Sequence, residues 1–122
     1  MSPGANYRTV LVCGGRKYAD FERLHYVLST IQAVHGFNVL VHGAAPGADQ
    51  LAGRWAGGRV VEVRAYPADW KKHGRAAGPI RNFAMREAEK PDVVIAFPGG
   101  AGTASMVRMA RAKGIEVLEV KP

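Results

Sequence analysis

The sequence predicts an α/β fold of three layers, in which a parallel β-sheet of about five strands carries helices on both faces. Short apolar runs rich in β-branched residues alternate along the 122 residues with segments whose apolar residues recur at helical spacing. Glycine-rich stretches follow three of these runs. Strands that alternate with helices pair in parallel, and right-handed crossovers then favour a Rossmann-like sheet with strand order 3-2-1-4-5.

In the first half of the chain, each predicted element ends at a residue that suits its boundary. Residues 9–13 form an apolar run that stops at two glycines, which indicates a buried strand. A helix opens at Asp20 and stops at Gly36. A second strand over 37–41 and a short helix over 49–56 complete this half.

The second half continues the alternation after one basic segment. In 60–66 valines alternate with charged residues, which predicts a strand at an edge of the sheet. Residues 67–77, rich in Lys and Arg, are expected to be a loop. Pro79 suits the first position of a helix that runs from 78 to about 89. The remaining predicted elements are a strand over 92–97, a helix over 103–113 closed by Gly114, and a strand over 115–120.

Length and composition predict a single domain over residues 1–122, with residues 1–6 flexible and without a signal pattern. The net charge of +7 indicates an anionic partner, with nucleic acid as a secondary candidate, or simply solubility. The single cysteine, Cys13, excludes an intrachain disulfide and a cysteine-rich zinc site, and we expect a buried thiol. No apolar stretch is long enough to span a membrane, so the sequence predicts a soluble cytoplasmic protein.

Glycine-rich loops follow the first, second and fourth predicted strands. They are Gly14-Gly15-Arg16, the segment 43–49 and the segment 98–103. In the predicted strand order these loops lie at the carboxyl ends of the strands, beside the point where the order reverses. We therefore expect them to converge on one crevice whose main-chain N–H groups bind an anion, usually a phosphate.

Side chains in these loops have alternative roles. Arg16 reaches a phosphate, stacks on a base or is a solvated surface arginine. His42 acts as a general acid or base, as a ligand contact or as a structural hydrogen-bonding group. Asp49 either caps its helix or accepts hydrogen bonds from a ribose, and Thr103 is expected to cap the last helix and to donate to a phosphate.

Arg81 is expected in the first turn of its helix, where the helix dipole disfavours a cation unless an anion or carboxylate lies nearby. Met85 follows one turn later on the same face. In the preceding loop, Trp70 either stacks on a base or has a packing role.

The predicted crevice thus combines bare main chain with a few cations and polar side chains. The expected ligand-binding residues are Gly14, Gly15, Arg16, His42, Gly43, Gly47, Ala48, Asp49, Arg81, Asn82, Pro98, Gly99, Gly100, Gly102 and Thr103. No metal ion is expected, because the spacing of His42, Asp49 and His73 is not that of a ligand set.

These loops resemble those of the SLOG superfamily, which joins the LOG (lysine-decarboxylase-like) proteins with the DNA-processing protein A group. The order Gly14-Gly15-Arg16, His42 to Asp49 and Pro98 to Thr103 is similar to that of its short YspA-type branch, common in bacteria and phages. The resemblance covers nearly the whole chain. It implies a nucleotide-derived ligand in the crevice, no required cofactor, and a homo-oligomer, either a dimer or a tetramer.

The LOG enzymes cleave the N-glycosidic bond of nucleoside monophosphates. Arg81 and Met85 match the Arg and Met of their signature, and Pro98 to Thr103 match the start of its Pro-Gly-Gly-x-Gly-Thr-x-x-Glu run. The closing Glu falls at Met106, which is expected to face the crevice but cannot stabilise a cationic sugar. The resemblance therefore makes Arg81 the candidate catalytic residue and leaves an enzymatic activity open.

Three functions remain after these observations. The first is binding of a nucleotide or nucleotide-derived phosphate ligand, as a sensor or carrier. The alternative is a LOG-like nucleotide N-glycosidase (phosphoribohydrolase). The second alternative is single-stranded nucleic-acid binding through Lys71, Lys72 and Arg75.

Overall fold

The structure, a computed structural model, describes residues 6–122 as five strands with intervening helices. Residues 1–5, which make up most of the segment predicted to be flexible, lie outside the described residues. The elements are β1 (Thr9–Cys13), α1 (Phe21–His35), β2 (Val39–His42), α2 (Ala48–Ala56), β3 (Glu62–Ala65), α3 (Trp70–His73), a 3₁₀ turn (Gly74–Ala76), α4 (Ala77–Glu89), β4 (Val93–Ala96), α5 (Ala101–Ala112) and β5 (Glu116–Glu119).

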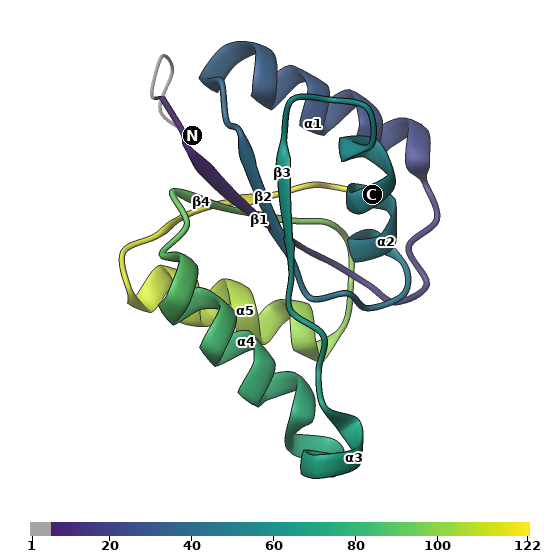
Figure 1. Ribbon diagram of the computed structural model, residues 1–122, viewed down its shortest axis with the longest axis vertical. Coiled ribbons are helices and arrows are strands. Elements are labelled where there is room, and N and C mark those ends of the chain that lie inside the picture. Colours follow the sequence, from purple (N-terminus) through teal and green to yellow (C-terminus); the bar gives the residue numbers. More distant parts are fainter. Residues whose placement is uncertain (1–5) are drawn as a thin grey trace.

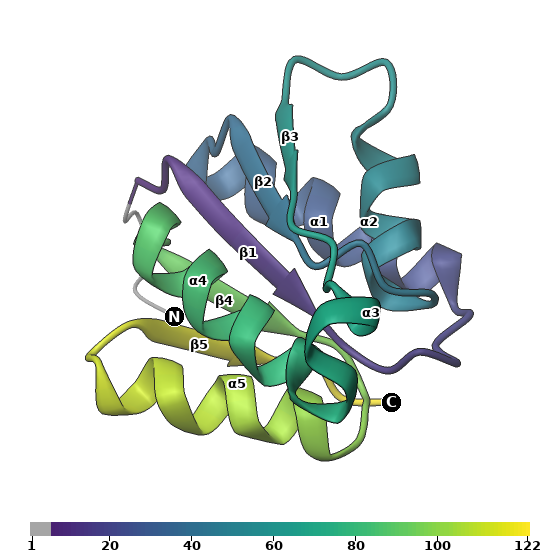
Figure 2. The same cartoon turned by 60° about the horizontal axis from the view of Figure 1, so that its bottom comes forward.

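The sheet confirms the predicted fold class and strand order. All four pairings are parallel, and the order is β3-β2-β1-β4-β5. Figure 1 shows α1 and α2 on one face of this sheet and α4 and α5 on the other. The arrows of β1, β4 and β5 run in one direction in Figure 2, so their carboxyl ends lie at the same edge.

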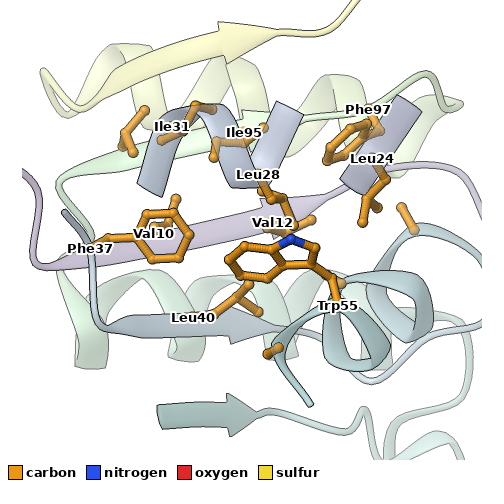
Figure 3. Close-up of a cluster of buried hydrophobic side chains, with 14 of the residues drawn as sticks. Val10, Val12, Leu24, Leu28, Ile31, Phe37, Leu40, Trp55, Ile95 and Phe97 are labelled. Carbon is orange, nitrogen blue, oxygen red and sulfur yellow. The ribbon is translucent and has the colours of Figure 1, made fainter. Parts of the chain in front are cut away.

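Each face of the sheet has its own hydrophobic core. Figure 3 shows the larger one, in which Leu28 of α1 and Trp55 of α2 pack over Val12 and Leu40 of the central strands. Successive side chains of a strand point to opposite faces, so Leu11 joins the second cluster instead. That cluster packs against α4 and α5 through buried methionines, Met85 and Met106.

Capping residues explain where the helices begin and end. Asp20 accepts a hydrogen bond from the Arg23 N–H at 3.0 Å, and Gly36 ends α1 in the left-handed conformation with φ 73°. Asp69 accepts in the same way from the Lys72 N–H at 3.1 Å and starts α3. The expectation of a loop over 67–77 was therefore wrong, because a capped turn and a 3₁₀ turn lead directly into α4 at Ala77.

The position of β3 at an edge of the sheet is confirmed, although the strand is shorter than the predicted 60–66. None of the helices within residues 6–122 combines the length and the apolar character needed to cross a membrane.

Candidate functional site

The loops that follow β1, β2 and β4 meet at the carboxyl ends of these strands, as predicted. Gly15 joins all three loops, because its N–H donates to the Pro98 carbonyl at 2.9 Å and its carbonyl accepts from the Ala48 N–H at 3.1 Å. Both bonds are between main-chain groups. The three turns therefore form a continuous rim at the point where the strand order reverses.

A cavity of about 530 Å³ opens beside this rim, within the range of small-molecule sites, roughly 300–1,000 Å³. The predicted residues that line it are Gly14, Gly15, Arg16, Gly43, Asp49, Arg81, Asn82, Gly100, Gly102 and Thr103. The other lining residues are Val12, Cys13, Ala45, Trp70, Gly78, Pro79, Met85, Ala101, Ser105 and Met109. Most of this second set is apolar, so the cavity joins a polar rim to an apolar wall.

Five residues of the predicted set do not line the cavity, namely His42, Gly47, Ala48, Pro98 and Gly99. They lie in the junction between the turns instead. A Cβ on Gly47 would lie 2.6 Å from the Arg16 carbonyl carbon, and a Cβ on Gly99 would lie 2.7 Å from the Gly15 nitrogen. These glycines are needed because main chain packs on main chain there.

The N-terminus of α5 opens on the cavity without a cap. The helix begins at Ala101, so Thr103 lies in its first turn and the prediction that it caps the helix was wrong. Gly100 is the N-cap residue and provides no side-chain cap, and within residues 6–122 no other side chain is seen to accept a hydrogen bond from the first N–H groups. A Cβ on Gly100 or Gly102 would meet nothing within 4 Å, so both positions leave this helix end accessible.

His42 and Asp49 hold the loop after β2. His42 Nδ1 accepts a hydrogen bond from the Ala44 N–H at 2.9 Å, and Asp49 Oδ2 accepts from the N–H groups of Gly43 and Ala45 at 3.1 and 3.2 Å. Burial raises the pKa of Asp49, although these donors and the nearby arginines oppose the change. Burial, together with the Arg81 charge, lowers the pKa of His42.

The hydrogen bonds narrow the possible roles of both side chains. His42 is a buried structural hydrogen-bonding group that holds a turn. Asp49 does not cap α2, because Gly47 is the N-cap residue and no side chain accepts there. Both bonds to Asp49 end on Oδ2, so Oδ1 can accept a hydrogen bond from a ligand in the cavity that Asp49 lines.

Arg81 ties α4 to the ends of β2 and β3. Its Nη1 donates to the Gly43 carbonyl and, at 3.3 Å, to the Tyr66 carbonyl, while its Nε donates to Asn82 Oδ1 at 2.8 Å. Burial lowers the pKa of Arg81, and Asp49 acts in the opposite direction. Because α4 begins at Ala77, Arg81 lies in the second turn, and the argument from the helix dipole does not apply.

Arg16 and Trp70 lie together at the cavity. The Arg16 guanidinium lies over the Trp70 ring at 5.1 Å from its centroid, a cation–π contact between the loop after β1 and α3. Both side chains line the cavity, and Trp70 is 48% exposed. The indole therefore faces the site, whereas the sequence did not decide between stacking on a base and packing.

Residue 106 does not face the crevice, contrary to the prediction. Met106 is 1% exposed in the core and does not line the cavity. Gly102, Ser105 and Met109 line it instead, at spacings of three and four residues that place them on one helix face. Helical spacing from Gly102 could have found Ser105 and Met109 had the start of α5 been placed correctly.

Cys13 lines the cavity wall, and the pKa of its thiol is raised. Burial raises its pKa to about 12, and Asp49 and Glu119 act in the same direction. The thiolate is the nucleophilic form, so this direction disfavours Cys13 as a nucleophile at neutral pH. Across residues 6–122, His, Cys, Asp and Glu side chains form no group of three that could hold a metal ion.

Comparison with known proteins places these features in a family. A sequence model described as the YspA, cpYpsA-related SLOG family matches residues 8–73, from the start of β1 to the end of α3. The Gene 61 protein of Mycobacterium phage D29 is 38% identical over 120 residues, which cover 91% of this chain and 94% of the phage protein. No solved structure has significant similarity to the chain.

Proposed function

Because the chain belongs to the YspA, cpYpsA-related SLOG family, we propose that its cavity binds a nucleotide or a nucleotide-derived phosphate ligand, as a sensor or carrier. The uncapped N-terminus of α5 is the observation that carries this proposal. It adjoins a cavity of about 530 Å³, and Gly100 and Gly102 leave it accessible. Free N–H groups and the positive end of the helix dipole favour a phosphate there.

Arginine side chains supply the remaining positive charge. Arg16 is exposed at the cavity, where release from the Trp70 ring frees its guanidinium for a phosphate oxygen. Within residues 6–122, the hydrogen bonds of Arg81 use Nε and Nη1, which leaves Nη2 for a ligand. Together these groups suit a dianionic phosphate monoester better than a neutral ligand.

The rest of the cavity suits the other parts of a nucleotide. Asp49 Oδ1 is an acceptor for a ribose hydroxyl. Met85 and Met109 form apolar wall against which a flat base can pack. The partly exposed Trp70 ring offers a stacking surface at the same site.

These residues favour binding over glycoside hydrolysis. Among the described residues that line the cavity, Asp49 is the one carboxylate, whereas glycosidic cleavage commonly uses two. Glu87 of α4 does not supply a second carboxylate, because it does not line the cavity and its Oε1 lies 3.9 Å from Lys113 Nζ. Arg81, the candidate catalytic residue, already bonds two main-chain carbonyls.

Calorimetric titration of the full chain with AMP, ADP-ribose and NAD tests the proposal. Adenosine and ribose 5-phosphate, titrated in parallel, separate the contributions of phosphate and base. We expect binding of at least one nucleotide and a roughly tenfold loss of affinity in Arg16→Ala, the loss of one charge-assisted hydrogen bond. Lys17→Ala is the matched control, because Lys17 is an adjacent exposed cation that does not line the cavity.

Two further measurements separate the alternatives. Native mass spectrometry of the purified protein shows any retained nucleotide, and chromatography of incubated AMP detects release of the base. Release of adenine that is lost in Arg81→Ala would favour the N-glycosidase. Absence of heat and of bound mass with every nucleotide, combined with salt-sensitive retention of an oligonucleotide, would overturn the proposal in favour of nucleic-acid binding.

A further inference from the structure

The free edge of the sheet at β3 carries a surface that does not involve the cavity. β3 pairs with β2 on one side only, and Val60 and Val63 are 95% and 41% exposed at this edge. An unpaired edge strand is a template for pairing with another chain. The residues of β3 indicate which kind of strand can pair with this free edge.

Main-chain groups of alternate residues point to the free edge. The N–H groups of Glu62 and Tyr66 donate to the Asn38 and His42 carbonyls of the neighbouring chain segment. Neighbouring residues of a strand direct their N–H and C=O groups to opposite sides. The N–H and C=O groups of Val63, which lies between Glu62 and Arg64, therefore point away from β2 and are available to another strand.

The side chains on either side of Val63 in one copy of β3 are complementary in charge to those of a second, antiparallel copy. When two copies of β3 pair antiparallel with Val63 opposite Val63, Glu62 of each copy lies opposite Arg64 of the other. In a pair of this kind the directly opposed residues are in close contact, and opposite charges stabilise it. Glu62 and Arg64 also bond within the chain at 2.6 Å, so the four charges would alternate in sign both along and across the strands.

The side chains of β3 point alternately to the two faces of the sheet, so paired copies would continue each face. Arg64 and Tyr66 bond Glu89 of α4, which places Glu62 and Arg64 on the α4 side. Val61 packs against the core cluster under α1 and α2, so Val61, Val63 and Ala65 lie on the other side. Pairing in this register extends an apolar face on one side and a charge network on the other.

We infer that β3 is an interface between two copies of this chain, which pair antiparallel about Val63 and join their sheets into one. This inference is independent of the proposed ligand. The SLOG resemblance implies an oligomer but names no surface, whereas the edge position, the free Val63 groups and the alternating charges specify one.

Sedimentation equilibrium of the full chain, from micromolar to millimolar concentration and without ligand, tests the interface. We expect the mass to rise from 13.1 kDa towards twice that value. Val63→Pro should abolish the rise, because proline removes the N–H that faces the partner but none that faces β2. A mass that stays at 13.1 kDa at every concentration would overturn the inference.

A charge reversal tests the register. Glu62→Arg places two arginines opposite each other at each end of the pair and should weaken dimerisation roughly tenfold. Glu22→Arg makes the same charge change on exposed α1 and should leave dimerisation unaltered. Dimers that persist unchanged in both Val63→Pro and Glu62→Arg would place the interface elsewhere and contradict the inference.

A disulfide provides a test that does not depend on affinity. Opposed residues in a hydrogen-bonded antiparallel pair have Cα atoms about 5.5 Å apart, within the range that a disulfide bridges. Mild oxidation should therefore link Val63→Cys chains covalently. The wild-type chain, whose single cysteine, Cys13, is partly buried and lies away from β3, is the control and should stay unlinked. Failure of the Val63→Cys chain to cross-link would also count against the pairing.

Discussion

Two groups of glycines at the same edge of the sheet have opposite surroundings. At Gly14, Gly47 and Gly99, an added Cβ would collide with other turns, so we call these the closed glycines. At Gly100 and Gly102, the open glycines, it would meet nothing within 4 Å. The closed glycines let the turns pack together, whereas the open glycines leave a helix end accessible. Glycine therefore allows the turns to pack together at one group of positions and leaves the N-terminus of α5 accessible at the other.

The comparison predicts that replacing glycine by alanine has opposite effects on stability in the two groups, and the largest effect is expected at Gly47. Gly47→Ala should lower the free energy of unfolding by about 3 kcal/mol or more, because the added Cβ meets the Gly15 and Arg16 main chain and φ is +82°. Gly58→Ala is the control, since φ is +77° there with nothing within 4 Å. Chemical denaturation measures the free energy of unfolding of both variants. Equal losses would show that the contact of the added Cβ with the Gly15 and Arg16 main chain does not contribute.

A smaller loss is expected at Gly14, where strain comes from packing alone. A Cβ there would lie 2.6 Å from the Ala48 Cβ and 2.9 Å from the Phe97 Cβ. Gly14→Ala should cost about 2 kcal/mol of stability. Ala48→Gly in the same chain should recover part of this loss in denaturant titrations, and no recovery would show that the clash with Ala48 is not the cause.

The open glycines should respond in the other direction. Gly102→Ala should raise the free energy of unfolding by roughly 0.5–1 kcal/mol, because alanine favours the helix and the added methyl has space. The same variant should weaken nucleotide binding in calorimetry, since the methyl enters the cavity. Ala104→Gly, at an exposed position outside the cavity, should lower stability without changing affinity. Unchanged affinity in Gly102→Ala would remove Gly102 from the binding site.

The last effect is expected only in acid and concerns the loop that carries Gly47. The pKa of His42 is lowered in the folded chain, so its contribution to stability is present above the ordinary histidine value and is lost as the pH falls through the folded value. His42→Asn can accept the Ala44 N–H without titrating. Thermal melts between pH 7 and pH 5 should therefore fall less steeply for this variant, and parallel curves would show that His42 does not anchor the loop.

The sequence allowed the sheet order and the meeting of the three loops to be predicted, because both follow from the alternation of strands and helices. It did not separate closed from open glycines. That difference depends on which turn lies against which, and Gly47 contacts Arg16 although 31 positions, 47 minus 16, separate them. The roles of His42 and Asp49 became clear only when their N–H partners were visible.

The wrong predictions have local physical causes. Lys71 and Lys72 resembled a solvated loop, yet the Asp69 cap is sufficient to start α3. Gly100 and Gly102 resembled helix breakers, so the start of α5 was placed at Thr103. Residue 106 was assigned to the crevice by its spacing from Thr103, whereas the helix face centred on Gly102, Ser105 and Met109 lines the cavity and Met106 packs in the core.

The bonds of Gly15 also determine when the crevice can exist during synthesis. One of them reaches Pro98, which lies between β4 and α5. A nascent chain on the ribosome therefore lacks the complete rim until Pro98 has been translated. The rim residues therefore assemble through contacts between distant parts of the chain, which form more slowly than local contacts.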